Sequence, residues 1–133
     1  MQPNFSKYMT AKFHSGSRGP DKYDCWGLVL AAFQEYGVFL PDYKLNCFDS
    51  GLINTTIDSC RGEWERIDLP VAPCLVVMRT DENAPGWCNH LGTFIGDGYF
   101  VHIGRGTGVL KTKTTDFYWM PRIEGFYRWK QGS

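Results

Sequence analysis

The sequence lacks an excess of charge of either sign, since 14 Lys and Arg residues balance 14 Asp and Glu residues in a chain of 133. Proteins that coat the phosphates of nucleic acids usually present clustered positive charge, so this balance argues against a general nucleic-acid binder. The sequence also lacks an apolar run of membrane-spanning length, and residues 1–6 show no charged-then-apolar signal pattern. We therefore expect no nucleic acid and no membrane among its partners. The chain would stay in the cytoplasm unless another machine carries it out.

Pairs of closely spaced cysteines are also missing. The five cysteines, at positions 25, 47, 60, 74 and 88, are odd in number and contain no C-x-x-C pair. A secreted disulfide framework usually has an even count in a smaller chain, so free thiols are expected. A zinc site could be assembled from Cys74, Cys88, His90 and His102, but the Cys-x-His spacing of 88–90 is not a usual ligand pair. We expect no metal, and the sequence indicates no cofactor.

The sequence is long enough for one domain and is rich in aromatic residues. A chain of this length forms one domain with a real core, so residues 1–133 are assigned to a single domain. Five Trp, seven Tyr and nine Phe residues could fill that core, line a groove, or do both.

The strongest helix signal follows Asp24. Apolar residues recur with the spacing of one helical face, at Trp26, Leu28, Val29, Ala32, Phe33 and Tyr36. Asp24 is a suitable N-cap, and Gly37 suits the position just past the helix end. Cys25 then lies in the first turn, where free N–H groups and the helix dipole favour a thiolate. The alternative is a buried structural cysteine, which is common for this residue type.

The remaining pattern places helices before strands. Short helices are predicted over residues 4–13 and near 50–60, with loops at 14–23 and 80–87 and a turn at 40–43. Short apolar runs between turn residues predict strands at 73–79, 90–95, 99–103, 108–114 and 125–129. This order predicts an α+β fold with a mostly antiparallel sheet.

Two of the three histidines, His90 and His102, fall on neighbouring strands of one predicted hairpin. A two-residue loop at 97–98 would turn the two rings to opposite faces. A three-residue loop at 96–98, with Gly98 left-handed, would place them on one face as diagonal neighbours, toward Cys25. The sequence allows both loops, and only the second serves a functional site.

That second arrangement would supply a complete set of groups for thiol chemistry. A cysteine nucleophile needs a base that takes its proton and later protonates the leaving amine. The base in turn needs a polar group that fixes its ring. Cys25, His90 and His102 could fill these roles, although a single strand histidine is more commonly a hydrogen-bonded packing residue.

Two blocks of sequence resemble a known family. Residues 24–29, Asp-Cys-Trp-Gly-Leu-Val, are similar to the Asp-Cys-Ser-Gly-(Leu/Phe)-Val motif of the NlpC-type cell-wall cysteine peptidases, a papain-like group. Residues 90–98, with His102 after them, are similar to that family's His-x-Gly-x-(aromatic)-Ile-Gly-x-Gly strand pair. The interval between the two histidines also matches, and residues 73–77 resemble the strand that precedes them.

The resemblance implies a papain-like fold with N-terminal helices and a nucleophile at a helix N-terminus packed on the sheet. It implies Cys25 as nucleophile, with its N–H in the oxyanion hole, His90 as general base and acid, and His102 as orienter. The implied reaction is hydrolysis of an amide in the peptidoglycan stem peptide, commonly between D-glutamate and a diamino acid. A related amidase or acyl-transfer enzyme with the same triad is an alternative.

Further details resemble the bacteriophage-tail branch of the family. These are Trp26, the segment 36–43 and the closing Gly-Phe-Tyr-Arg of residues 125–128. This resemblance implies a phage or prophage protein made in the bacterial cytoplasm, with other tail proteins as partners. An assembly protein that keeps the fold and acts mainly through contacts is a further alternative.

Two departures from the family pattern concern substrate binding. Phe13 stands near the position of a tyrosine that helps to bind the amino end of the stem peptide, and Trp26 replaces the serine after the nucleophile. Together with Asp24, these residues are the candidates for substrate contact.

Overall fold

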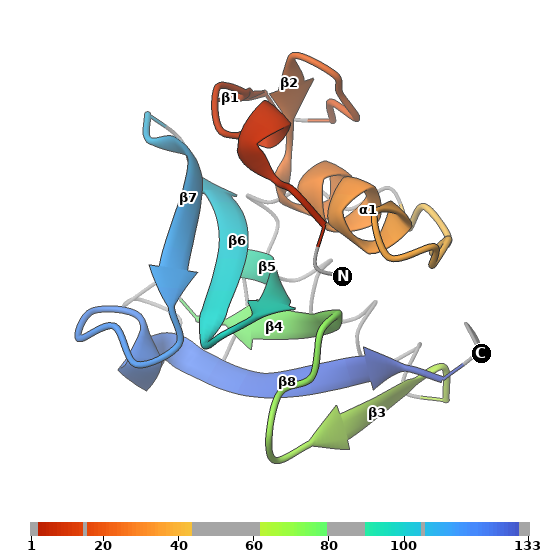
Figure 1. The fold of residues 1–133 in the computed structure, drawn as a ribbon, viewed down its shortest axis with the longest axis vertical. Helices are drawn as coiled ribbons and strands as arrows, with labels where there is room; N and C mark the ends of the chain where they lie inside the picture. The colour runs from red at the N-terminus through yellow and green to blue at the C-terminus, as the bar shows by residue number, and fades with distance from the viewer. Residues whose placement is uncertain (1–2, 15, 44–61, 80–89, 105, 131–133) are drawn as a thin grey trace.

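The computed structural model describes residues 3–14, 16–43, 62–79, 90–104 and 106–130. One α-helix, α1 (Cys25–Gln34), packs on a six-stranded sheet whose neighbouring strands are all antiparallel (Figure 1). The strand order is β3-β8-β4-β5-β6-β7. The strands are β3 (Trp64–Ile67), β4 (Cys74–Met78), β5 (His90–Gly96), β6 (Tyr99–Gly104), β7 (Gly108–Lys113) and β8 (Ile123–Trp129). The α+β prediction is confirmed.

Both ends of α1 are formed as its sequence predicts. Asp24 caps the helix, because its Oδ1 accepts the N–H of Gly27 at 2.7 Å. The chain leaves the helix at Gly37, whose φ of 78° lets the N–H of Val38 reach back to the carbonyl of Phe33. The apolar face is buried against the sheet at Leu28, Val29, Ala32 and Phe33.

The N-terminal segment differs from its prediction. Residues 4–13 form a 3₁₀ turn, η1 (Ser6–Tyr8), and a short strand, β1 (Lys12–Phe13), instead of a helix. Strand β1 pairs in parallel with β2 (Lys22–Tyr23), which lies in the predicted loop. Of the apolar side chains at helical spacing, Phe5 and Tyr8 are buried and Met9 is exposed. Long-range pairing with the segment before α1 replaces the local helical hydrogen bonds.

The predicted strands are all present, with β8 beginning two residues early. The sequence analysis missed β3 because this edge strand exposes charged residues at Glu65 and Arg66 instead of alternating regularly. It also missed a second 3₁₀ turn, η2 (Met120–Arg122). The predicted helix near 50–60 and the loop at 80–87 lie outside the described residues.

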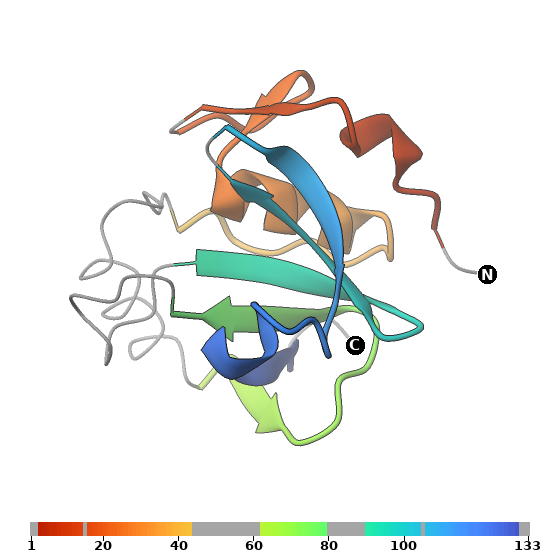
Figure 2. The same cartoon turned by 90° about the vertical axis from the view of Figure 1, so that its left-hand side faces the viewer.

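The core has two layers, one on each face of the sheet. Figure 2 shows α1 on one side of β5 and the turn that precedes β8 on the other. The larger layer joins α1 to residues such as Leu91, Ile95, Val101 and Ile103, and the smaller layer contains Cys74, Val76, Met78, Phe94 and Phe100. Among the described residues, no helix has the length and apolar character needed to cross a bilayer.

Candidate active site

The hairpin of β5 and β6 places the two histidines on one face by a different turn from the one predicted. Asp97 and Gly98, with φ of 55° and 80°, form a two-residue turn between the paired residues Gly96 and Tyr99. The register then shifts at Ile95, so that Phe94 pairs with Phe100. The predicted positive φ of Gly98 is confirmed, whereas the three-residue loop is wrong. One extra residue in β5, a bulge, has the effect that the loop was expected to have.

The bulge brings the two imidazole rings together. His90 Nε2 and His102 Nδ1 are 2.9 Å apart, which confirms that the rings share a face. Gly92 makes room for this contact, because a Cβ at that position would lie only 3.2 Å from the Cβ of His102. On its far side, His102 Nε2 lies 2.9 Å from the hydroxyl of Thr112 on β7. The polar chain therefore runs diagonally across three strands.

The shared face is not the one that α1 covers. The ring of His102 lies 4.7 Å from that of Phe100, in the smaller core layer, whereas α1 packs on the other face. The prediction that both rings lie toward Cys25 therefore depends on where the helix begins and not on the face that α1 covers. His90 is the first residue of β5, however, and α1 and β5 begin at the same end of the molecule (Figure 2). Any meeting of Cys25 with His90 has to occur at this end.

Trp119, just before η2, covers both imidazoles. Its ring stacks on His90 at 5.4 Å and meets His102 edge-on at 4.6 Å between centroids. Asp116 fixes the turn that carries Trp119, because its Oδ1 accepts the N–H groups of Tyr118 and Trp119. The sequence analysis missed Trp119 and Thr112. An Asp two residues before an aromatic pair is the only local signal, and it indicates a turn without indicating what the turn covers.

Burial keeps both rings neutral. Loss of hydration lowers the pKa of His90 to about 4, although the residue retains some exposed surface at the start of its strand. Burial, together with the neighbouring His90, lowers the pKa of His102 to about 3. Near pH 7 both rings are therefore unprotonated, as a general base must be before it reacts, and the lowered pKa makes each a weaker base than a free imidazole. Within the described residues, no group of three or more His, Cys, Asp or Glu side chains could hold a metal ion.

Cys25 begins α1 and is only 1% exposed. It is disulfide-bonded in this structure, against the expectation of free thiols. Cys74 is free and buried, and burial raises its pKa to about 12, so it behaves as an unreactive core thiol. Cys25 can act as a nucleophile only after its disulfide is reduced.

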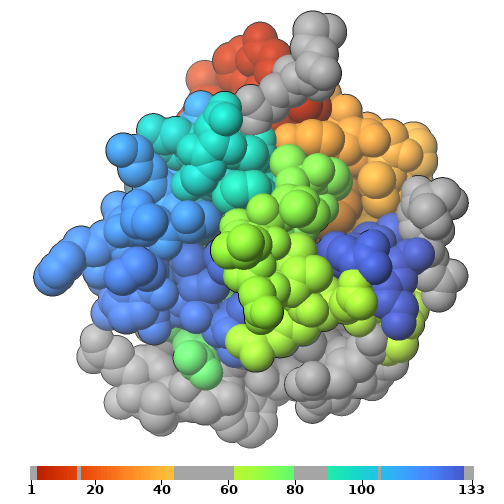
Figure 3. Space-filling view, turned by 60° about the horizontal axis from the view of Figure 1, so that its bottom comes forward, coloured from red at the N-terminus to blue at the C-terminus, as the bar shows by residue number. Residues whose placement is uncertain are grey.

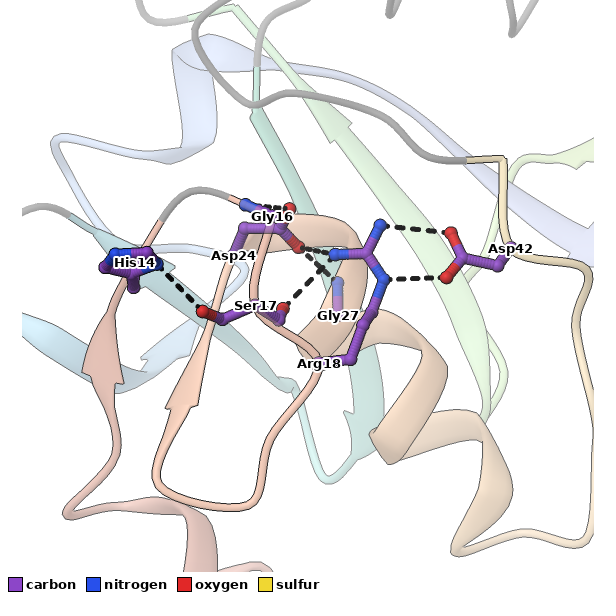
Figure 4. A network of polar contacts seen from close by, with 7 residues as sticks. All are labelled: His14, Gly16, Ser17, Arg18, Asp24, Gly27 and Asp42. Atoms are coloured by element: carbon purple, nitrogen blue, oxygen red, sulfur yellow. Dashed lines mark hydrogen bonds and ion pairs between the residues drawn. The ribbon is translucent and has the colours of Figure 1, made fainter.

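A polar network fixes the residue that precedes Cys25 (Figure 4). Asp24 is fully buried, and its Oδ1 accepts from Arg18 Nη1 at 2.7 Å as well as from the helix cap. Its Oδ2 accepts the N–H of Gly16 at 3.0 Å. Arg18 also donates two hydrogen bonds, at 2.9 and 3.0 Å, to the carboxylate of Asp42 beyond the helix. Both carboxylate oxygens of Asp24 thus have partners within the protein, and its role in substrate contact stays a prediction.

The other two predicted substrate-binding residues lie in different surroundings. Trp26 is 1% exposed and packs on Tyr43 at 5.1 Å between ring centroids. Its indole N–H has no hydrogen-bond partner among the described residues. Phe13 in β1 is partly buried against the core layer beneath α1. Phe13 therefore keeps surface for a ligand, whereas Trp26 is a core side chain here. Substrate contact by either residue stays a prediction.

A separate hollow of about 390 Å³ lies between the segment that follows β3 and the start of β8. Figure 3 looks onto this face, where the yellow-green segment around residues 62–73 lies beside blue residues of the C-terminal part. Leu69, Met120 and Phe126 are among its lining residues, and none of the candidate site residues is. It is therefore distinct from the histidine pair.

Comparison with known proteins agrees with this fold. The sequence profile of the NlpC/P60 family matches residues 10–128, so the chain belongs to the NlpC/P60 family. Members of this family are typically cysteine peptidases or amidases that act on peptidoglycan. Among curated protein sequences, none matches the chain.

Solved structures show the same fold. NlpC1 and NlpC2 from Trichomonas vaginalis are 22% and 20% identical to this chain, with TM-scores of 0.65 and 0.67. A protein of Staphylococcus aureus described as similar to a lipoprotein of the NLP/P60 family is 19% identical, with a TM-score of 0.61. Each match covers 92% of this chain but only 40%, 43% and 37% of the respective relatives. The chain thus spans less than half the length of these relatives.

Proposed function

We propose that this chain is a cysteine hydrolase that cleaves an amide bond in the stem peptide of bacterial peptidoglycan. Cys25 is the nucleophile, His90 the general base and acid, and His102 the residue that orients His90. The hydrogen bond of 2.9 Å between the two rings is the observation that carries this proposal. Membership of the NlpC/P60 family supports the substrate class.

The hydrogen bond determines which atom of His90 can react. Because Nε2 points to His102, only Nδ1 is left to take the proton from the reduced thiol of Cys25. The thiolate attacks the amide carbonyl carbon, and the N–H of Cys25 donates to the resulting oxyanion. His90 then gives its proton to the leaving nitrogen as the C–N bond breaks, which leaves a thioester on Cys25. Water attacks this thioester with His90 as base, and the carboxylic acid leaves with a free thiol.

Digestion of purified peptidoglycan in the presence of a thiol reductant tests the proposal. Mass analysis should find stem-peptide fragments that have gained one water at a single amide, and Cys25→Ala should yield none. Fragments of the same kind from Cys25→Ala, or none from the reduced wild-type protein, would contradict the proposal.

The same digestion separates the alternatives. An acyl-transfer enzyme would join the acyl group to an added amine, and a related amidase would cut a different amide. An assembly protein would leave the peptidoglycan intact. The phage-tail origin rests on Trp26 and the segments 36–43 and 125–128, and none of the relatives named above is described as a phage protein.

A further inference from the structure

The hydrogen-bonded chain that begins at His90 does not end at the predicted orienter. Thr112 is buried on β7, where it pairs with Phe100 and lies diagonally across from His102 on the same sheet face. Its Oγ1 is 2.9 Å from His102 Nε2. Both ring nitrogens of His102 therefore have a polar partner, one on each neighbouring strand.

We propose that Thr112 is a positioning residue that sets the tautomers of both imidazoles. The Thr112 oxygen accepts Nε2–H of His102, which leaves Nδ1 of that ring as an acceptor. This nitrogen then accepts Nε2–H of His90, and His90 keeps its lone pair on Nδ1. The effect on catalysis rests on the proposed function, but the tautomers themselves do not.

The surroundings of His102 make the threonine hydroxyl hard to replace. The ring of Phe100 lies 4.7 Å from the imidazole, and Trp119 meets it edge-on at 4.6 Å. His102 is 1% exposed, so water has little access to its nitrogens. Without the hydroxyl, a proton on Nε2 would be a buried donor with no acceptor.

Loss of the hydroxyl should therefore reverse the direction of the hydrogen bond between the two imidazoles. The proton of His102 would move to Nδ1, where His90 Nε2 can accept it. His90 would then carry its own proton on Nδ1, the atom that has to accept the proton from Cys25. A single change on β7, two strands away from His90, would in this way remove the base without changing its position.

The test uses ¹⁵N-labelled histidine and NMR of the reduced, full-length protein near pH 7. The wild-type protein should show the Nε2–H tautomer for both His90 and His102. In Thr112→Val both should change to Nδ1–H. The kcat on peptidoglycan should fall about 10- to 100-fold, because the reactive tautomer would then leave a buried N–H without an acceptor. Thr112→Ser, which restores the hydroxyl, should recover both the tautomers and the rate.

Thr93 provides a matched control. It is fully buried on β5, and within the part of the chain that the structure describes its hydroxyl has no hydrogen-bond partner. It pairs with Val101, on the sheet face that α1 covers, so Thr93→Val removes a hydroxyl from the same hairpin but not from the chain of rings. This variant should leave the tautomers and kcat unchanged.

The wild-type spectrum decides the matter even if Thr112→Val fails to fold, because Nδ1–H on His102 would overturn the inference directly. Unchanged tautomers in a folded Thr112→Val variant would also overturn it. If the tautomers respond as expected but even the wild-type protein leaves peptidoglycan intact, the role of Thr112 stands and the proposed function fails.

Discussion

His90 and His102 are neutral because water is kept from their rings, and this affects the stability of the fold. Their pKa values of about 4 and about 3 lie below the ordinary value of about 6.5 for an unfolded chain. The unfolded state therefore binds more protons than the folded state at acidic pH. The stability that neutral burial contributes is fully present above pH 6.5 and is lost as the pH falls toward the folded-state values.

The first prediction follows from this difference. The free energy of unfolding should fall between about pH 6.5 and pH 4, and His102→Gln should make that fall shallower because it removes one buried titrating ring. Urea denaturation at successive pH values measures it. His14→Gln, which removes an exposed histidine, is the control, and an equal change in slope for both variants would contradict the assignment.

The second prediction separates base from orienter. His90→Ala should lower kcat nearly as much as Cys25→Ala, whereas His102→Ala should cost less and His102→Gln less still. General acid–base catalysis is worth about 10²–10⁴-fold, of which orientation is a part. The double variant His90→Ala/His102→Ala should be hardly slower than His90→Ala, since nothing is left to orient. If the losses of the two single variants multiplied in the double variant, the two rings would act independently.

At the level of residues, the sequence predicted Cys25 at the helix start and the two histidines on one hairpin. It could not predict Thr112 or Trp119, because each reaches His102 from a separate segment and neither has a periodic or motif signal. Only the pairing of β6 with β7 and the path of the chain before β8 bring them to the rings.

Among the elements, α1 depends on the ionic network at its N-terminus. Arg18 precedes the helix and Asp42 follows it, so one guanidinium connects both flanking segments to the buried carboxylate of Asp24. The hydrogen bonds to these two carboxylates hold the pKa of Arg18 above its ordinary value. The network fixes where the first turn, and with it Cys25, begins.

The third prediction compares the two carboxylates. Asp24→Ala removes the cap and leaves Arg18 without its buried partner, so it should lower the unfolding free energy by about 2–4 kcal/mol. Asp42→Asn alters the more exposed ion pair and should cost less than about 1 kcal/mol. Denaturant unfolding of both variants gives the comparison, and equal losses would show that burial does not distinguish the two contacts.

The fourth prediction concerns the turn between β5 and β6. Gly98 has a φ of 80° with open space around it, so Gly98→Ala meets only backbone strain, about 1–2 kcal/mol. Gly62 also has open space but lacks a positive φ, and Gly62→Ala should be nearly neutral. Thermal or denaturant unfolding distinguishes them. Similar losses in the two variants would rule out backbone strain as the cause.

The sequence predicted α1 and the five strands from 73 onward because each has a strong apolar pattern bounded by turn residues. It did not predict β1, β2 or β3, whose short and partly charged segments become strands only through distant partners. The sequence did not predict the bulge at Ile95 for a related reason. An Asp-Gly turn is a local signal, but the register beyond it depends on contacts that each strand makes with distant parts of the chain.

For the whole molecule, the fifth prediction concerns reactivity. With Cys25 disulfide-bonded, iodoacetamide should not label it until a reductant is added, and peptidoglycan hydrolysis should show the same dependence. Cys74 should label slowly in both states, since its pKa is about 12 and it is buried. Mass spectrometry of the alkylated peptides measures both sites. Rapid labelling of Cys74 in the folded protein, or of Cys25 without reductant, would contradict this.

The bulge also links the hydrogen bond between His90 and His102 to the register of the hairpin. The same Asp97–Gly98 turn could support a regular ladder without the bulge, and since β6 is apolar on both faces, hydrophobic burial discriminates only weakly between the two registers. In the regular ladder the imidazoles would separate, whereas the bulged one lets His102 meet His90 and lets the Tyr36 hydroxyl donate to the carbonyl of Ile95 at 3.2 Å. We therefore expect the groups proposed to carry the chemistry to favour the bulged alignment of the hairpin over the regular one. A variant without either ring should lose the proposed base and part of this preference together.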